Sequence, residues 1–280
     1  MAHDDWQSDR LDVDGYLQRL RVPPRSPSRG ALAELQEAHV RAFTFDNIDV
    51  LLGRHPGVSL DAVQEKFVGR GRGGYCFEHC TIFAAALERL GYQVRRHLGR
   101  VGDPDAGTQQ ARTHMVVEVV VAGERLLCDP GFGMSLLRPI AMTDGAQDDY
   151  LPGWRFRLRR TEAADWALYR LREQGWELAH TTDELVVRPV DVVMGHHYTS
   201  TYPGSHFTFG LMVAKHVPGR HITVTHDSLT IRTPGEPTEH RPLRDGELEE
   251  WLSLLEARLS PDEQHRLLET LHLLPTREAE

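Results

Sequence analysis

The spacing of hydrophobic residues changes about a third of the way along the chain. Before this point apolar residues recur every three or four positions, as at Leu60, Val63 and Phe67, which is the spacing of one face of a helix. After it, segments such as 113–121 are rich in β-branched residues, which favour strands. The pattern therefore predicts a helical part over 11–92 and a β-rich part after it.

The β-rich part is expected to consist of short strands joined by turns. A hairpin is predicted over 113–129, with its turn at Ala122 and Gly123. Helical spacing returns at 243–259 and 261–274. Further strands are expected at 155–159, 166–172, 184–188, 207–213 and 222–231, and linkers or turns at 145–153 and 202–204. Together these segments predict an α+β fold.

Composition indicates an ordinary globular protein. The 280 residues are enough for two or three packed units. No apolar run is long enough to span a membrane, and the N-terminus is acidic and lacks the apolar core of a secretion signal. Three cysteines are too few for a disulfide framework. We therefore expect a cytoplasmic protein that does not bind a membrane.

The charge balance argues against one class of partner. Acidic residues outnumber basic ones by 41 to 32, which gives a net charge of −9. General nucleic-acid binders present a basic face. Nucleic acid is therefore not an expected partner.

The segment 72–78, Arg-Gly-Gly-Tyr-Cys-Phe-Glu, carries the clearest sign of chemistry. Its cysteine, Cys76, follows a glycine turn and begins a predicted helix that ends near Gly91. Backbone N–H groups and the helix dipole stabilise a thiolate at such a position. The two glycines permit a tight turn and leave space beside the sulfur. Cys76 is therefore the predicted nucleophile of covalent catalysis.

A cysteine nucleophile needs a base and a group that orients the base. His114 is the best candidate base, because it begins a β-rich segment that can hold its ring rigidly. Asp129 is the best orienting acid, because it ends the second strand of the predicted hairpin just before a Pro-Gly break. The two residues lie at the same open end of that hairpin, so local geometry alone makes them neighbours.

Each of these residues alone has a more ordinary interpretation. A single cysteine in an intracellular chain is most often a buried hydrophobic residue. With 16 histidines in the chain, one on a strand is expected in any case. Asp129 before Pro-Gly is a common turn residue, and phenylalanines are usually core residues. The prediction of a catalytic group depends on the joint order of these residues.

Three other motifs give weaker signals. A zinc site lacks a second ligand pair at suitable spacing, so no metal is expected; its possible ligands are Cys76, His79, Cys80 and Cys128. The glycine pattern at 69–74 follows a helical segment, whereas a dinucleotide-binding motif follows a strand. The basic stretch 95–100 is either a solvated strand edge or a contact for phosphates.

The ordered set of motifs resembles the arylamine N-acetyltransferase family. The resemblance includes 72–78, Thr113-His114 and the Asp-Pro-Gly-Phe-Gly of 129–133. The segment 43–48 is similar to the family's Pro-Phe-Glu-Asn-Leu, and 200–207 to its Ser-Thr-x-Pro-x-Ser-x-Phe. These segments occur in the family's order and extend over nearly the whole chain.

The resemblance implies a multi-domain fold in three parts, with a cysteine-protease-like arrangement of the catalytic triad. It implies an N-terminal helical bundle over 1–92 that carries the nucleophile. It implies a central β-barrel over 93–203 that carries the histidine and the aspartate, and an α/β lid over 204–280.

The resemblance also implies an activity: ping-pong transfer of an acetyl group from acetyl-CoA to the nitrogen of arylamines, hydrazines or N-hydroxyarylamines. The implied partners are a small aromatic amine or hydrazine and coenzyme A, with xenobiotic metabolism as the setting. The implied triad is Cys76, His114 and Asp129. The implied acceptor pocket is lined by Phe45, Phe132 and Phe207, and coenzyme A is expected to approach Thr113, Gly131 and Gly133.

Some positions depart from the family pattern. Cys80 stands where the family usually has asparagine, and His79 replaces a neutral residue. Competing functions are a macrolactam-forming amide synthase with the same triad, a papain-like hydrolase, and a non-catalytic thiol sensor or metal-binding module. The choice of acyl donor distinguishes the amide synthase. Turnover without an amine acceptor would indicate the hydrolase, and absence of acetyl transfer would indicate the sensor or metal-binding module.

Overall fold

The computed structural model describes residues 5–102, 110–134, 136–151, 153–162 and 164–274. Its helical elements are η1 (Ser8–Arg10), α1 (Val13–Leu20), α2 (Arg29–Ala42), α3 (Ile48–Leu51), α4 (Leu60–Gln64), η2 (Glu65–Gly69), α5 (Cys76–Arg89), α6 (Pro189–Thr201), α7 (His206–Phe209), α8 (Glu247–Leu254) and α9 (Pro261–Leu273). Its strands are β1 (Phe45–Asp46), β2 (Gln93–Val101), β3 (His114–Val121), β4 (Glu124–Cys128), β5 (Ile140–Ala141), β6 (Gln147–Leu151), β7 (Trp154–Arg160), β8 (Trp166–Arg172), β9 (Gly175–Thr182), β10 (Met212–Val217), β11 (Arg220–Thr225), β12 (Ser228–Arg232) and β13 (Glu239–Pro242).

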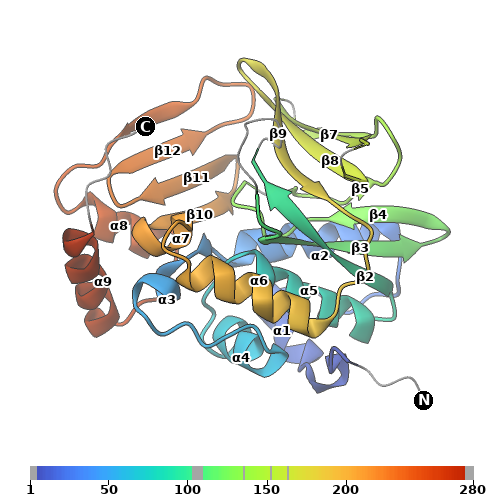
Figure 1. Ribbon diagram of the computed structural model, residues 1–280, viewed down its shortest axis with the longest axis horizontal. Helices are drawn as coiled ribbons and strands as arrows, with labels where there is room; N and C mark the ends of the chain where they lie inside the picture. Colours follow the sequence, from blue (N-terminus) through green and yellow to red (C-terminus); the bar gives the residue numbers. More distant parts are fainter. Residues whose placement is uncertain (1–4, 103–109, 135, 152, 163, 275–280) are drawn as a thin grey trace.

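The strands form two antiparallel sheets. The larger has the order β5-β4-β3-β2-β9-β8-β7-β6, and its edge strands β5 and β6 touch, so it is a nearly closed barrel. The smaller has the order β1-β10-β11-β12-β13. Figure 1 shows the N-terminal helices below the barrel and the smaller sheet beside it, with α8 and α9 at the outer side. The α+β prediction is confirmed.

Helix α5 lies at the centre of the molecule. It packs against β2 and β3, and every side chain from Cys76 to Leu87 is buried. A helix buried on all sides needs its polar termini satisfied internally. At its start, Glu78 accepts a hydrogen bond from the backbone N–H of Tyr75 at 3.1 Å. At its end, Gly91 adopts φ +89°, as predicted for the position after the last turn.

The predicted hairpin is formed by β3 and β4. Val121 pairs with Glu124 across the turn, and Ala122 and Gly123 both have positive φ, at 52° and 80°. Two successive positive φ values are typical of the tight turn that matches the twist of a two-residue hairpin. Because Val117 pairs with Cys128, His114 and Asp129 both lie at the open end of the hairpin, as expected.

Several element predictions were wrong. Residues 184–188 are not a strand and lead into α6. This helix was not predicted, because Val190, Val192 and Val193 disfavour a helix. Capping outweighs that preference, since Pro189 occupies the first turn and Asp191 accepts from the N–H of Arg188 at 2.8 Å.

Three boundaries in the β-rich part also differ from prediction. The expected strand 207–213 begins as helix α7, and its strand starts only at Met212. The expected strand 222–231 is two strands with a turn between them, and the expected linker 145–153 contains β6. β6 pairs with the next strand β7, and β11 with the next strand β12, whereas β10 pairs with the distant β1. Local composition does not report such pairing.

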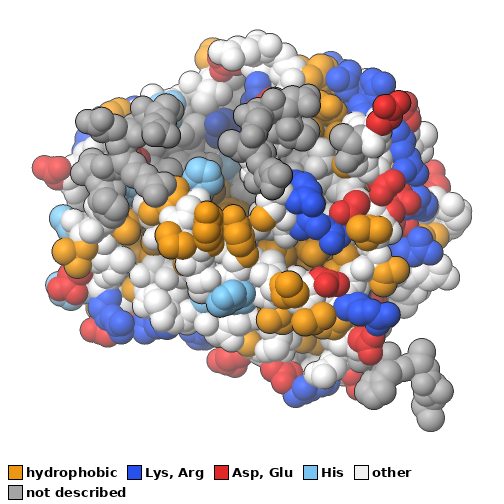
Figure 2. Space-filling model, in the orientation of Figure 1, with side chains coloured by type: hydrophobic (Ala, Val, Ile, Leu, Met, Phe, Trp, Pro, Cys, Tyr) orange, Lys and Arg blue, Asp and Glu red, His pale blue; other side chains and the backbone are white. Residues whose placement is uncertain are grey.

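Helix α6 covers the segment that carries Cys76. A Cβ on Gly195 would lie 2.7 Å from the ring of Phe77, so the absence of a side chain permits this close packing. His196 hydrogen-bonds Tyr75, the residue before the nucleophile. The opposite side of α6 is apolar and exposed, with Val190, Val193, Met194 and Tyr198 among its residues. Figure 2 shows hydrophobic side chains on the face where α6 lies.

Within the described part of the chain, no helix is both long and apolar enough to cross a membrane.

Candidate active site

The predicted nucleophile lies at the first position of α5. Cys76 is 3% exposed, and its thiol contacts the carbonyl oxygen of Thr113 at 3.3 Å. The free backbone N–H groups of the first turn give the start of a helix partial positive charge. The structure thus places Cys76 at the helix start, as predicted.

The glycines before Cys76 bring strand β1 against the turn. A Cβ on Gly73 would lie 1.8 Å from the carbonyl oxygen of Thr44, and one on Gly74 would lie 2.1 Å from the carboxylate of Glu78. Neither glycine has a positive φ. The reason for glycine here is close approach, and not the tight turn that the sequence suggested. The N–H of Asp46 donates to the carbonyl of Gly74 at 2.7 Å, which fixes β1 beside the nucleophile.

His114 and Asp129 meet at the open end of the hairpin. His114 Nε2 lies 3.1 Å from Asp129 Oδ1, and the two side chains are almost fully buried. Cys76 also lies close enough to His114 to raise the pKa of its imidazole. The structure therefore brings together the three residues that the sequence singled out.

The charges of this group follow from its surroundings. Burial lowers the pKa of His114, but the charge and hydrogen bond of Asp129, together with Cys76, raise it to about 10. Burial raises the pKa of Asp129, but His114 and His180 outweigh burial and hold it well below its usual range. Near neutral pH the pair is an imidazolium and a carboxylate.

A second histidine, which the sequence analysis missed, completes the group. His180 on β9 places Nε2 3.0 Å from Asp129 Oδ2. Burial lowers its pKa, so the ring is neutral and donates its Nε2–H to the carboxylate. Nothing local marks this residue, because it reaches Asp129 only through the pairing of β9 with β2. The alternation of side chains along β9 was the one signal in the sequence that could have indicated His180.

The ligand atoms of His114, Asp129 and His180 all lie within 4.8 Å of one another. A metal ion uses such spacing, but here each imidazole Nε2 faces a different carboxylate oxygen at hydrogen-bond distance. Hydrogen bonding accounts for the arrangement. The zinc ligands considered from the sequence do not form such a group among the described residues.

The three predicted aromatic residues lie in two groups, one beside His114 and one beside Tyr75. The Phe132 ring centre lies 5.2 Å from that of His114. Phe45 and Phe207 lie together, with ring centres 6.1 Å apart, and Phe207 also contacts Tyr75 at 5.4 Å. Phe132 and Phe207 are half-buried, so each presents part of its ring at the surface. The rings border the space around Cys76 with apolar surface.

The residues expected near coenzyme A lie at the same place. Thr113 contacts the sulfur of Cys76 through its backbone carbonyl. A Cβ on Gly131 would lie 2.7 Å from Cys76 Cα, so this glycine packs directly against the nucleophile. Gly133 accepts a hydrogen bond at its carbonyl from His221 Nε2 at 2.7 Å. The loop 130–134 thus lies against both Cys76 and the smaller sheet.

The unusual His79 takes part in a buried chain of hydrogen bonds below the site. Its Nε2 lies 3.0 Å from the carbonyl of Thr44, which can only accept, so Nε2 carries the hydrogen. His79 Nδ1 then accepts from His39 Nε2 at 2.8 Å, and His39 Nδ1 accepts from the Tyr16 hydroxyl at 2.7 Å. Burial lowers the pKa of both histidines, that of His79 to about 4, so the chain is neutral. It holds Thr44, and hence Phe45, in place.

The remaining cysteines lie in the core. The Cys80 thiol donates to the carbonyl of Met115 at 3.0 Å, and burial raises the pKa of both Cys80 and Cys128. Both residues are free and fully buried. Their neutral thiols are consistent with the ordinary interpretation of a buried cysteine.

The basic stretch 95–100 lies on β2, which pairs with β3 on one side and with β9 on the other. Arg96 and His97 are buried, where Arg96 pairs with Glu88 at 2.7 Å and His97 with Glu118 at 2.8 Å. Arg95 and Arg100 are exposed. The solvated-edge interpretation therefore holds for these two arginines and is wrong for Arg96 and His97.

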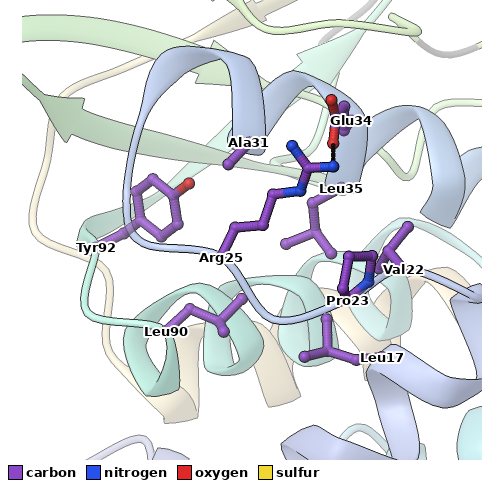
Figure 3. A pocket seen from close by; sticks show the side chains of 9 residues that line it. All are labelled: Leu17, Val22, Pro23, Arg25, Ala31, Glu34, Leu35, Leu90 and Tyr92. Carbon is purple, nitrogen blue, oxygen red and sulfur yellow. Dashed lines mark ion pairs between the residues drawn. The ribbon is translucent and has the colours of Figure 1, made fainter.

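Cavities of different sizes lie beside the helices. One of about 20 Å³ lies at the far end of α5 from Cys76, with the Arg25–Glu34 ion pair at its side (Figure 3). Another of about 10 Å³ is lined by residues that include Phe45 and Gly133. A larger one of about 320 Å³ lies against α8 and α9, away from the predicted nucleophile.

Comparison with known proteins gives consistent matches over most of the chain. A family model described as N-acetyltransferase matches residues 30–259. An arylamine N-acetyltransferase / N-hydroxyarylamine O-acetyltransferase of Salmonella typhimurium is 33% identical over 229 residues, which is 81% of each chain. An arylamine N-acetyltransferase of Mycolicibacterium smegmatis is 36% identical over 239 residues, 82% of this chain and 85% of that one.

Solved structures agree with these matches. The arylamine N-acetyltransferase of Mycobacterium abscessus superposes with a TM-score of 0.88 at 33% identity, covering 95% of this chain and 97% of that one. The Mycobacterium marinum enzyme in complex with CoA superposes with a TM-score of 0.85 at 31% identity, covering 93% and 98%.

Proposed function

The chain belongs to the arylamine N-acetyltransferase family, and we propose that it transfers the acetyl group of acetyl-CoA to the nitrogen of an arylamine, a hydrazine or an N-hydroxyarylamine. The proposed route is ping-pong, through an acetyl group carried on Cys76. The observation that carries this proposal is the meeting of Cys76, His114 and Asp129 from two separate elements and a loop. The relative solved with CoA supports the choice of donor.

In the first half-reaction the Cys76 thiolate attacks the carbonyl carbon of the donor thioester. The bond from that carbon to the coenzyme sulfur breaks, and the departing thiolate takes the proton of the His114 imidazolium. Asp129 keeps the ring oriented while its charge changes. Coenzyme A leaves as the thiol, and Cys76 carries the acetyl group.

In the second half-reaction the amine nitrogen attacks the acetyl carbon on Cys76. Neutral His114 accepts the proton that the nitrogen loses, and the sulfur leaves as a thiolate. The amide product departs, and the thiolate–imidazolium pair is restored. Phe45, Phe132 and Phe207 supply the apolar surface against which an aromatic acceptor packs, and this surface excludes water that would hydrolyse the acetyl-enzyme.

We propose that coenzyme A approaches along Thr113, Gly131 and Gly133, because these residues lie beside the sulfur on the side of the 130–134 loop. The absence of a side chain at Gly131 keeps the loop close to the backbone of Cys76.

The test is product formation with purified protein, acetyl-CoA and a panel of arylamines and hydrazines, followed by chromatography of the N-acetyl product. Cys76→Ala is expected to abolish transfer. Cys80→Ala, one helical turn away and buried, is the matched control and is expected to retain it. Double-reciprocal plots at several amine concentrations are expected to be parallel. Transfer by Cys76→Ala at the wild-type rate, or no product from any amine, would refute the proposal.

A further inference from the structure

Two arginines occupy the inner face of the barrel at its open end. Along β8, Trp166 and Leu168 face the barrel interior and are buried. Because side chains alternate along a strand, the next two positions on this face are Arg170 and Arg172. The pairing with β7 confirms the face, since Arg170 lies opposite the buried Phe156. Along the inner face of β8, the side chains therefore change from apolar to cationic towards the open end of the barrel, which we call the barrel mouth.

A third arginine reaches the same place from the smaller sheet. Arg232 ends β12, opposite His221 in register. Burial, and the charges of Arg170 and Arg232, lower the pKa of Arg172 to about 10. Arg170 and burial lower the pKa of Arg232 as well. The geometry agrees, because His221, the register partner of Arg232, donates to the carbonyl of Gly133, and the next residue, Met134, contacts Arg172.

The acidic residues nearby leave this cluster cationic. Glu177 pairs with Arg170 at 2.8 Å and with Arg172 at 3.1 Å. Glu177 and Glu173 both act on Arg232 through their charges, so three guanidinium groups face two carboxylates. The buried Nε of Arg232 has no hydrogen-bond partner among the described residues. A buried donor without a partner is costly unless a ligand supplies an acceptor.

The cluster lies next to the proposed reaction site. The Arg170 guanidinium carbon is 5.5 Å from the centre of the Phe132 ring, which also contacts His114 and His180. The Arg172 Nη1 contacts the sulfur of Met134 at 3.0 Å, at the end of the same loop. The guanidinium groups are thus offset from Cys76 along the loop 130–134. The phosphates of a CoA thioester are likewise offset from its reacting sulfur, by the pantetheine arm.

We propose that Arg170, Arg172 and Arg232 form an anion subsite that binds the phosphate groups of the acyl donor. This inference rests on the proposed acetyl transfer and names the part of the donor that the barrel mouth recognises. Arginine suits this role because its planar fork of donors matches phosphate oxygens and keeps its charge when partly buried. A carboxylate on an acidic aromatic acceptor has related chemistry, and the experiment separates the two sources.

The first arm compares two donors. Cys76 acylation is followed by intact mass at limiting donor for wild type, Arg172→Gln and Arg232→Gln, with acetyl-CoA and with phosphate-free S-acetylpantetheine. The acylation rate with acetyl-CoA is expected to fall about tenfold or more in each variant, and that with S-acetylpantetheine to stay unchanged. Arg159→Gln is the matched control, because Arg159 is on the same barrel, largely exposed and paired with Asp144. Equal losses with both donors, or no loss with acetyl-CoA, would overturn the subsite.

The second arm compares acceptors at saturating acetyl-CoA. A neutral aniline and an aminobenzoate are expected to give the same ratio of rates in wild type and in Arg232→Gln. A selective loss with the aminobenzoate would assign the cluster to the acceptor and refute the assignment to the donor.

The third arm is independent of catalysis. Calorimetric affinity for coenzyme A is expected to weaken about tenfold or more in Arg172→Gln, and affinity for pantetheine to remain unchanged. If wild type is acylated by no donor, the acetyl-transfer proposal fails. Selective weakening for coenzyme A still supports the subsite in that case, whereas unchanged affinity removes it.

Discussion

Asp129 holds two imidazole rings at once, one at each carboxylate oxygen. The two rings have different charges. His114 is protonated because the nearby carboxylate outweighs burial, whereas His180 stays neutral because burial and the charge of His114 outweigh its own bond to the carboxylate. One ring therefore holds the reacting proton, and the other holds the carboxylate in place.

Replacing Asp129 by Asn tests how His114 acquires its charge. Without the carboxylate the effect of burial remains, so the pKa of His114 is expected to fall below 6.5. The imidazolium would be lost at pH 7.5, and the rate of Cys76 acylation is expected to fall about a thousandfold. Rapid-quench mass spectrometry gives the rate, and ¹⁵N NMR of the histidine rings gives the charge. A variant that acylates at nearly the wild-type rate would contradict this assignment.

The same pair makes stability depend on pH. His114 has a folded pKa of about 10 against an ordinary value of 6.5, so its contribution is complete below pH 6.5 and is lost as pH rises through 10. The lowered pKa of Asp129 contributes above its ordinary value of 3.8 and is lost as pH falls below it. The difference in unfolding free energy between wild type and Asp129→Asn is expected to be largest between pH 4 and 6.5. Urea unfolding at pH 5.5, 7.5 and 9.5 measures it, and a difference that grows towards pH 9.5 would show the wrong sign.

His180 is expected to act by positioning Asp129. Its replacement by Ala leaves one carboxylate oxygen buried without a donor, which costs about 1–3 kcal/mol of stability. The acylation rate is also expected to fall, with its upper pH limit shifted down because Asp129 holds the proton on His114 less firmly. His180→Gln retains a donor at the position of Nε2 and is expected to restore much of the rate and the pH limit. A loss of stability in the Ala variant with an unchanged pH profile would indicate a purely structural role.

At the scale of elements, close backbone contacts hold the start of α5. The loop residue Gly131 touches the nucleophile backbone, and a Cβ there would lie 2.7 Å from Cys76 Cα and 3.0 Å from its carbonyl oxygen. Neither atom can move without moving the helix start. The position of the sulfur therefore depends on a glycine in a different segment of the chain.

Gly131→Ala is expected to destabilise the protein by about 1–3 kcal/mol and to lower the acylation rate, because the Cβ displaces either the loop or the helix start. Gly30→Ala is the matched control: Gly30 lies in α2 with open space at its Cβ, and the change is expected to stabilise by about 0.5 kcal/mol. Thermal unfolding and the acylation rate check both. Equal behaviour of the two variants would remove the proposed role of the close contact.

The parts of the site that depend on local geometry could be predicted from the sequence. The hairpin places His114 beside Asp129 through its own turn, and the glycine segment marks Cys76 as the start of a helix. His180 could not be predicted, because it lies 51 residues after Asp129 and reaches it only when the barrel closes. Helix α6 was missed because its valines suggest a strand, whereas its capping residues decide for a helix.

At the scale of the whole molecule, buried charges join the nucleophile helix to the C-terminal helix. Lys66 pairs with Glu78 of α5 at 2.8 Å and with Asp49 at 2.9 Å. Arg72 pairs with the same Asp49 at 2.8 Å and with Glu263 of α9 at 2.9 Å. The segment that leads into Cys76 is therefore bound to α3, α5 and α9 through one network.

Replacing Arg72 leaves Asp49 paired with Lys66 and Glu263 paired with Arg54, so each carboxylate loses one of two cations. Arg72→Met is expected to lower the unfolding free energy by about 1–3 kcal/mol. Arg188→Met is the matched control, because Arg188 is 67% exposed and its contact with Asp5 is long, at 3.6 Å; its stability is expected to be unchanged. Denaturant unfolding of both variants checks this, and a stable Arg72→Met protein would show that the network contributes little.

In the proposed mechanism Cys76 carries the acetyl group. The most direct test is the intact mass of the full chain mixed with acetyl-CoA in the absence of amine, followed by peptide mapping. The account predicts one acetyl group, located on Cys76 and removed when an arylamine is added. An acetyl group on another residue that the amine consumes, or transfer to the amine without any acetyl group on Cys76, would contradict it.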